Sequence, residues 1–161
     1  MLSMSKRADY ALLALSYLAA AGETPGRLVN TKEIAEQYGI PAELLAKLLQ
    51  ALAKKGLVGS HPGPTGGYRL LRPSSQITVA EVLLLIDGPL SMLHCSDGQG
   101  SNCKQYQRCT IRDPLVEIES RVRELLENIT LAEVSGPPPV PTIMKDFSRR
   151  SYALGLPVHL R

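Results

Sequence analysis

The sequence lacks an apolar run long enough to cross a membrane. Its longest candidate, residues 82–86, falls far short of the roughly 20 residues that a membrane-spanning helix needs. Residues 1–7 also lack the charged region, apolar core and cleavage site of a secretory signal peptide. We therefore expect a cytoplasmic protein that does not associate with a membrane.

Motifs typical of catalysis are also missing. The chain has no phosphate-binding loop, no nucleophile with a nearby base and no metal-hydrolase motif, and its histidines, His61, His94 and His159, are scattered. A redox enzyme would need a Cys-x-x-Cys pair at the start of a helix, and this pair does not occur. The sequence therefore favours a binding protein over an enzyme.

The net charge of +3 is small, but its distribution is uneven. Residues 1–74 hold nine Lys and Arg against five Asp and Glu, whereas residues 75–161 hold nine against ten. A mildly basic first half suits a polyanion such as nucleic acid, and a balanced second half suits self-association.

Residues 30–55 have the layout of a helix-turn-helix. Asn30 with Glu33 is typical of a helix start, Gly39 ends this short helix, and a longer amphipathic helix over residues 42–55 follows. One face of the longer helix carries Leu44, Leu45, Leu48, Leu49 and Leu52. Such a pair can present its second helix to the major groove, but the same geometry occurs in bundles that do not touch DNA.

A β-hairpin is predicted after this pair of helices. Two short extended runs flank a tip rich in Gly and Pro at residues 61–67. Gly66 and Gly67 would let the backbone approach a phosphate closely, with Arg69 and Arg72 beside it. The hairpin shifts the interpretation toward a DNA-binding winged helix.

The second half predicts a long helix and a tail. A helix that starts near Asp113 carries apolar residues at 3-4-3-4 spacing, namely Leu115, Ile118, Val122, Leu125 and Ile129. This seam predicts a homodimer that forms through the long helix. The proline-rich stretch that follows will not hold regular structure.

The predicted fold class is mainly α with a small β-hairpin wing, as a winged helix-turn-helix plus a long dimerisation helix. We divide the chain into a DNA-binding domain (1–88), a cysteine-containing loop (89–112), a dimerisation helix (113–134) and a flexible Pro-rich tail (135–161).

All cysteines of the chain lie in one loop. Cys95, Cys103 and Cys109 are spaced C-x7-C-x5-C. Thiolates are the usual ligands of iron–sulfur clusters, and a loop rich in Gly, Ser and Asn can wrap one. A zinc site with a nearby histidine, a thiol redox switch and inert buried cysteines fit the same spacing. From spacing alone these alternatives stay open.

The string Gly66-Gly67-Tyr68-Arg69-Leu70, in its place after Gly56-Leu57-Val58, is highly specific. It resembles the wing of a family of bacterial winged-helix iron–sulfur transcription regulators, the family that includes IscR and NsrR. Further likeness lies in Asp9-Tyr10-Ala11, Ile34-Ala35, Ile77-Thr78, Asp87-Gly88 and Asn128-Ile129-Thr130, so that it covers about the first 134 residues. The resemblance implies a homodimeric transcription regulator, a repressor, that reads a palindromic operator in double-stranded DNA.

The resemblance also implies which residues contact DNA. We expect Lys47 and Gln50 to contact it from the recognition helix, Gly66 and Gly67 to approach a phosphate, and Tyr68 and Arg69 to position the wing. For each of them a solvated or structural role is the alternative. The chain departs from the family at two places. Pro62 stands where members commonly carry an arginine that enters the minor groove, and Ala46 replaces a larger polar residue.

In the family, three cysteines before the long helix hold the cluster, usually with a shorter first gap. The longer gap here leaves open whether the cluster is 2Fe–2S or 4Fe–4S. Cluster-assembly members take a fourth ligand from a histidine at the position of Arg112, whereas some nitric-oxide sensors use a carboxylate that matches Asp9.

We therefore expect a cluster held by Cys95, Cys103, Cys109 and Asp9 of the partner subunit, with His94 and Asp113 as alternative fourth ligands. Such a protein would sense redox, nitric oxide or iron status. The alternative is a thiol-switch or zinc-stabilised DNA-binding regulator without a cluster.

Overall fold

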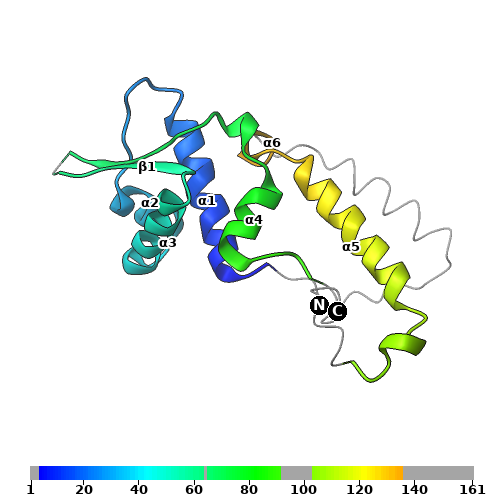
Figure 1. Cartoon of the computed structure of the whole chain (residues 1–161). Helices are drawn as coiled ribbons and strands as arrows, with labels where there is room; N and C mark the ends of the chain where they lie inside the picture. The colour runs from blue at the N-terminus through cyan, green and yellow to red at the C-terminus, as the bar shows by residue number, and fades with distance from the viewer. Residues whose placement is uncertain (1–3, 64, 92–102, 136–161) are drawn as a thin grey trace, which may run out of the picture.

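The fold is mainly helical with a hairpin, as predicted. The computed structural model describes residues 4–63, 65–91 and 103–135 (Figure 1). Its helices are α1 (Lys6–Ala21), α2 (Thr31–Tyr38), α3 (Ala42–Lys54), α4 (Val79–Asp87), α5 (Arg112–Glu127) and α6 (Leu131–Ser135). Strands β1 (Val58–His61) and β2 (Gly67–Leu70) pair antiparallel, and short 3-10 turns lie at η1 (Ser74–Gln76) and η3 (Tyr106–Arg108).

Helix α1 lies at the centre of the fold and contacts α2, α3, α4, α6 and β2. Its buried side includes Ala8, Ala11, Ala14, Leu15 and Leu18. The alanines allow neighbouring helices to approach closely, and the leucines fill the space between them. The predicted leucine stripe of α3 packs against this core, except that Leu44 is half-buried. The helix-turn-helix is thus fixed to α1 by apolar contacts.

Three helices begin at a capping side chain followed by a glutamate three positions on, as predicted for Asn30 and Glu33, but the glutamates act differently. The cap pairs are Asn30 with Glu33 in α2, Thr78 with Glu81 in α4, and Thr130 with Glu133 in α6. In α6 the pair is reciprocal, because the Glu133 carboxylate accepts from the Thr130 backbone N–H at 2.7 Å. In α2 and α4 the carboxylate instead binds a side chain from another element. These two glutamates therefore contribute to tertiary structure.

The wing is anchored on both edges of β2. One edge pairs with β1, from Val58 opposite Leu70 to His61 opposite Gly67. On the other edge Val29 exchanges two backbone hydrogen bonds with Tyr68, of 3.0 and 2.8 Å. The segment before α2 therefore acts as a third, one-residue strand that holds the hairpin on the helix-turn-helix.

Helix α5 projects from the body, and a second bridge fixes its C-terminal end. Thr78, before α4, pairs with Thr130, just after α5, and the Leu131 N–H donates to the Ile77 carbonyl at 2.7 Å. In Figure 1 the N-terminal end of α5 and the turn η3 lie at the far end of the molecule from the hairpin.

Several predicted features fall outside the described residues, among them Cys95, His94 and the tail from residue 136 on. Pro41 takes the capping position before α3, and the short turns η1 and η3 had not been predicted. In the part of the chain that the structure describes, no helix has both the length and the apolar character needed to cross a membrane.

Candidate nucleic-acid interface and cysteine loop

The recognition helix α3 presents a polar line to solvent. Lys47 and Gln50, the predicted base contacts, are both exposed, as is Glu43 one turn earlier. Spacings of four and three residues place these side chains on one side of the helix, opposite the buried leucines. This side of α3 is free to enter a groove of DNA.

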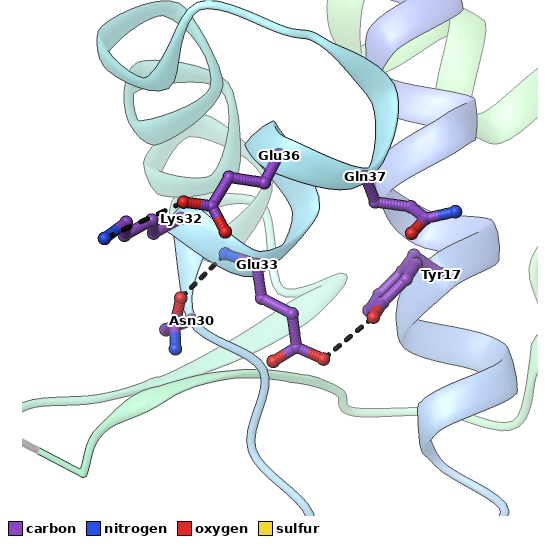
Figure 2. Close-up of a pocket in the computed structure, with 6 residues that line it drawn as sticks. All are labelled: Tyr17, Asn30, Lys32, Glu33, Glu36 and Gln37. Atoms are coloured by element: carbon purple, nitrogen blue, oxygen red, sulfur yellow. Dashed lines mark hydrogen bonds and ion pairs between the residues drawn. The ribbon is translucent and has the colours of Figure 1, made fainter.

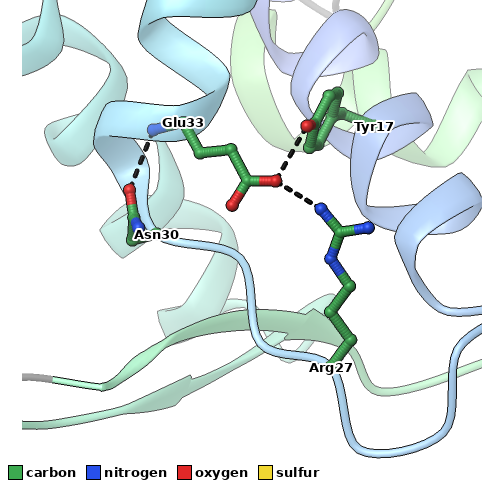
Figure 3. Close-up of polar contacts among 4 residues, drawn as sticks. All are labelled: Tyr17, Arg27, Asn30 and Glu33. Carbon is green, nitrogen blue, oxygen red and sulfur yellow. Dashed lines mark hydrogen bonds and ion pairs between the residues drawn. The ribbon is translucent and has the colours of Figure 1, made fainter.

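A polar cluster braces α2 against α1 and the loop before it (Figure 3). The Tyr17 hydroxyl donates to the Glu33 carboxylate at 2.8 Å, and the Arg27 guanidinium donates to the same oxygen. The neutral hydroxyl is favoured by its bond to the Glu33 carboxylate and by burial, so the pKa of Tyr17 is raised. The ring of Tyr17 also meets Tyr38 edge-on, with centroids 6.0 Å apart. Both ends of α2 are thereby held, and α2 in turn supports α3.

An open hollow of about 540 Å³ lies beside this cluster (Figure 2). It is lined by Tyr17, Asn30, Lys32, Glu33, Glu36 and Gln37. Lys32 pairs with Glu36 at 3.7 Å across the surface of α2. Two carboxylates against one ammonium do not favour a phosphate here, so the hollow does not extend the DNA-facing surface.

The wing glycines are required by the chain itself. A Cβ on Gly66 would lie 2.2 Å from the His61 carbonyl oxygen, and one on Gly67 would lie 2.5 Å from the Val29 carbonyl oxygen. Neither backbone group can move without breaking the hairpin or the Val29–Tyr68 bridge. Crowding within the chain is therefore enough to require glycine at both positions. From the sequence we had expected these glycines to let the backbone approach a DNA phosphate.

The other wing residues divide between packing and exposure. Tyr68 is half-buried against the core, whereas Arg69 and Pro62 are exposed. Arg72 is held by an ion pair with Glu81, at the start of α4. The prediction that Arg72 stands beside the hairpin tip to meet a phosphate is therefore wrong. Arg69 is therefore the guanidinium of the hairpin that faces solvent.

The described part of the cysteine loop is a short turn attached to α5. Cys103 is exposed and Cys109 half-buried, and both are free thiols. The two cysteines lie on either side of η3, and the Tyr106 N–H donates to the Cys103 carbonyl at 3.0 Å. Arg112, at the start of α5, donates to the Tyr106 carbonyl at 3.3 Å and to Asp113 at 2.8 Å. The side chain at the family's histidine position therefore fixes the turn instead of offering a ligand.

Asp9 lies in the first turn of α1, where Lys6 approaches it to 3.9 Å. Among the described residues of one chain, no three His, Cys, Asp or Glu side chains converge as a metal site. The structure thus does not bring Asp9 together with Cys103 and Cys109, and its assignment to a partner's cluster stays a prediction. Asp113, an alternative ligand, is paired with Arg112.

The apolar seam of α5 is largely uncovered. Ile118 is 45% exposed and Leu125 is 52% exposed, and Leu84 of α4 is 55% exposed. A groove of about 810 Å³ runs between α4 and α5, and its apolar lining includes Leu83, Leu84, Val122 and Leu126. An apolar groove with exposed Leu and Ile side chains on the same two helices favours an interaction site.

Sequence reasoning did not find the positioning roles of three residues around the interface. Val29, Arg27 and Arg72 hold the wing and α2 in place, yet each has its partner in another element. Their partners include Glu33 and Glu81, which lie three positions after the capping residues of α2 and α4.

Comparison with known proteins agrees with this arrangement. The profile of the Rrf2 family, described as iron-dependent transcriptional regulator, matches residues 4–136. The chain belongs to the Rrf2 family. Rv1287 of Mycobacterium tuberculosis (strain ATCC 25618 / H37Rv), named as an HTH-type transcriptional regulator, is 38% identical over 133 residues, which cover 83% of this chain and 81% of Rv1287.

Two further regulators are similar to the chain. IscR of Sodalis glossinidius (strain morsitans) is 35% identical over 132 residues, covering 81% of this chain and 77% of that protein. The structure of CymR of B. subtilis, named as the global cysteine regulator, superposes with a TM-score of 0.65 at 25% identity, over 84% of this chain and 97% of CymR. The protein is thus a DNA-binding transcriptional regulator with a winged helix, and its relatives are regulators and not enzymes.

Proposed function

We propose that this Rrf2 protein is a cytoplasmic, homodimeric repressor that reads a palindromic operator and responds to redox, nitric oxide or iron status through an iron–sulfur cluster. The observation that carries the DNA-reading part is the exposed polar line of α3 beside a wing that is fixed on both edges. Lys47 and Gln50 would meet base edges, and Arg69 would neutralise a phosphate. Gly66, Gly67 and Tyr68 would give the wing its shape.

The exposed α5 seam supports the homodimer. Ile118 and Leu125 are about half exposed in one chain, and the groove between α4 and α5 adds further apolar surface. A partner's α5 would bury both. Two-fold symmetry of the dimer would then impose two-fold symmetry on the operator.

The donor set fits an iron–sulfur cluster in its chemistry. Cys103 and Cys109 are free, accessible thiols that flank one short turn, and Cys95 supplies a third thiol from the same loop. Asp9 of the partner subunit would be the fourth ligand. When bound, a cluster would supply a group that reacts with oxygen or nitric oxide. IscR, a named relative, belongs to the same family.

Helix α5 would link the loop to the DNA-binding part. Its N-terminal end is tied to η3 by Arg112, and its C-terminal end is tied to α4 by the bridge between Thr78 and Thr130. A change in how the loop is held would therefore shift α5, the dimer and the spacing of the two recognition helices.

DNA binding is tested by measuring the affinity for a duplex, selected from a randomised library, at several salt concentrations. Arg69→Ala should weaken binding to all sequences alike and reduce the salt slope by about one unit. Gln50→Ala should instead relax preference at particular base pairs. Arg121→Ala, on α5, is the control for loss of a positive charge elsewhere. Absence of salt-dependent duplex binding by the parent, with and without metal, would contradict the proposed function.

The ligand set is tested by anaerobic spectroscopy. Replacement of Cys95, Cys103 or Cys109 by Ala should abolish the cluster, whereas Asp9→Ala should allow assembly but shift the spectrum and speed loss in air. A carboxylate is a harder donor than a thiolate, so its iron should be the labile one. Spectra and decay of Asp9→Ala that match the parent, beside altered ones for His94→Ala, would transfer the role to His94.

A thiol switch is the second candidate, favoured by the free thiols of Cys103 and Cys109 on one short turn. CymR, to which the chain is similar, is named as a regulator of cysteine. In that case oxidant alone should change DNA affinity in metal-free protein, and mass spectrometry should show an oxidised thiol.

A further inference from the structure

The recognition helix carries a negative charge where DNA phosphates would disfavour it. Glu43 lies in the first turn of α3, is exposed, and shares one side of the helix with Lys47 and Gln50. A carboxylate on a surface that faces phosphates is repelled by them unless it meets a hydrogen-bond donor. Its presence on this line therefore needs an explanation.

Glu43 is not used within the chain. Among the described residues its carboxylate makes no hydrogen bond or ion pair, and the same holds for Lys47, one turn further on. By contrast, Arg121 pairs with Glu117 at 2.9 Å across the same helical spacing on α5. Both side chains of the α3 pair are thus free to bind separate groups.

The surroundings leave the carboxylate room to reach a base. Apart from Lys47, which makes no ion pair with it, its neighbours include the small residues Ala42, which is exposed, and Ala46, which is half-buried. Neither can cover the carboxylate or compete for the same base edge. On its own major-groove edge cytosine offers the N4 amino donor and no acceptor, whereas adenine carries the N7 acceptor beside its N6 amino group, and acidic side chains characteristically accept from cytosine N4.

We propose that Glu43 is a specificity-determining residue that selects a C·G pair in each half-site, by accepting a hydrogen bond from cytosine N4. The proposal rests on the proposed reading of DNA by α3. The local alternative is that Glu43 only stabilises the positive end of the helix dipole, because the Pro41 cap provides no side-chain hydrogen bond.

The test compares base preferences of the full-length parent, E43A and E43Q, selected from a randomised duplex library and checked by titration. The parent should prefer C·G by at least about fivefold at one position per half-site. E43A should lose that preference and keep the others. E43Q should shift it toward adenine, since Gln pairs with adenine N6 and N7.

Glu36→Gln, which removes one carboxylate from α2, is the matched control and should leave every preference as in the parent. An E43A profile that equals the parent's at every position would overturn the assignment, and a lowered melting temperature beside it would identify a dipole role. Failure of the parent to bind any duplex would overturn the proposed function together with this assignment, so the two failures are distinguishable.

Discussion

The guanidinium of Arg112 lies over the ring of Tyr106, 4.7 Å from its centroid. The same side chain also donates to the Tyr106 carbonyl, so that one residue at the start of α5 holds the turn between Cys103 and Cys109 twice. The resemblance to cluster-assembly regulators led us to expect a histidine ligand at this position, and here the position carries an arginine that contacts the turn. The turn then keeps its shape without a metal bond at this point.

Removal of the Arg112 side chain should loosen the turn between Cys103 and Cys109. In metal-free Arg112→Ala, the η3 amides of Tyr106 and Arg108 should exchange hydrogen about two- to fivefold faster, since an exposed cation–π contact contributes about 0.5–1 kcal/mol. Hydrogen exchange read by NMR measures this directly. Tyr106→Phe keeps the ring and the carbonyl and should exchange like the parent. Exchange rates in Arg112→Ala equal to those of the parent would show that Arg112 does not hold the turn.

Charge in the α5 seam should break the dimer. Ile118→Glu or Leu125→Glu would place a carboxylate in an apolar interface without a partner and should give monomer or unfolded chain. Sedimentation or light scattering gives the mass, and circular dichroism distinguishes the two outcomes. Ser120→Glu adds the same charge on the opposite, exposed side of α5 and should stay dimeric. A dimer mass for both seam variants would remove this seam from the interface.

A methyl group at Gly67 should damage the wing. Its Cβ would lie 2.5 Å from the Val29 carbonyl oxygen, and overpacking of this kind costs about 1–3 kcal/mol or more. Chemical denaturation of Gly67→Ala should show this loss, with weaker DNA binding beside it. Gly59→Ala is the matched control in the same hairpin, because its Cβ would meet only side-chain atoms, of Leu71 from 3.0 Å and of Arg69 at 3.8 Å. Equal free energies of unfolding for the two variants would contradict the role of the Val29–Tyr68 bridge in holding the wing.

Acid should weaken the cap at the start of α6, beside the bridge that ties α5 to the body. The Thr130 backbone N–H and then its hydroxyl donate to Glu133, so the pKa of Glu133 is lowered. A carboxyl with a lowered folded pKa stabilises the fold above its unfolded pKa, and that contribution is lost as pH falls through the folded pKa. The free energy of unfolding should therefore drop less below about pH 4.5 in Glu133→Gln than in the parent. The same pH dependence of the free energy of unfolding in Glu133→Gln and in the parent would argue against a stabilising cap at Thr130 and Glu133.

Local features of the fold could be predicted from the sequence, since they depend on neighbouring residues. The cap at Asn30, the αL glycine Gly39 that ends α2, and the leucine stripe of α3 each follow from spacing within a few positions. Contacts between distant segments could not be predicted in this way. The bridge from Val29 to Tyr68 and the pairing of Arg72 with Glu81 need the folded arrangement of several elements.

The candidate site shows the same division. Exposure of Lys47 and Gln50 follows from the helical period of α3, whereas the reason for Gly67 depends on a backbone that approaches from before α2. The assignment of three thiols and Asp9 came from resemblance to the family, and the described residues contain two of those thiols and Asp9, not brought together within one chain.

The most direct test is to purify the full-length protein without oxygen, measure its iron, sulfide and zinc, and titrate the selected duplex with cluster-loaded and cluster-free protein. We predict brown protein that contains iron and sulfide, and duplex affinities that differ by at least about fivefold between the two states, the lower end of typical coupling between sites. Colourless protein that contains zinc or no metal, or equal affinity in both states, would contradict a regulator that senses through a cluster.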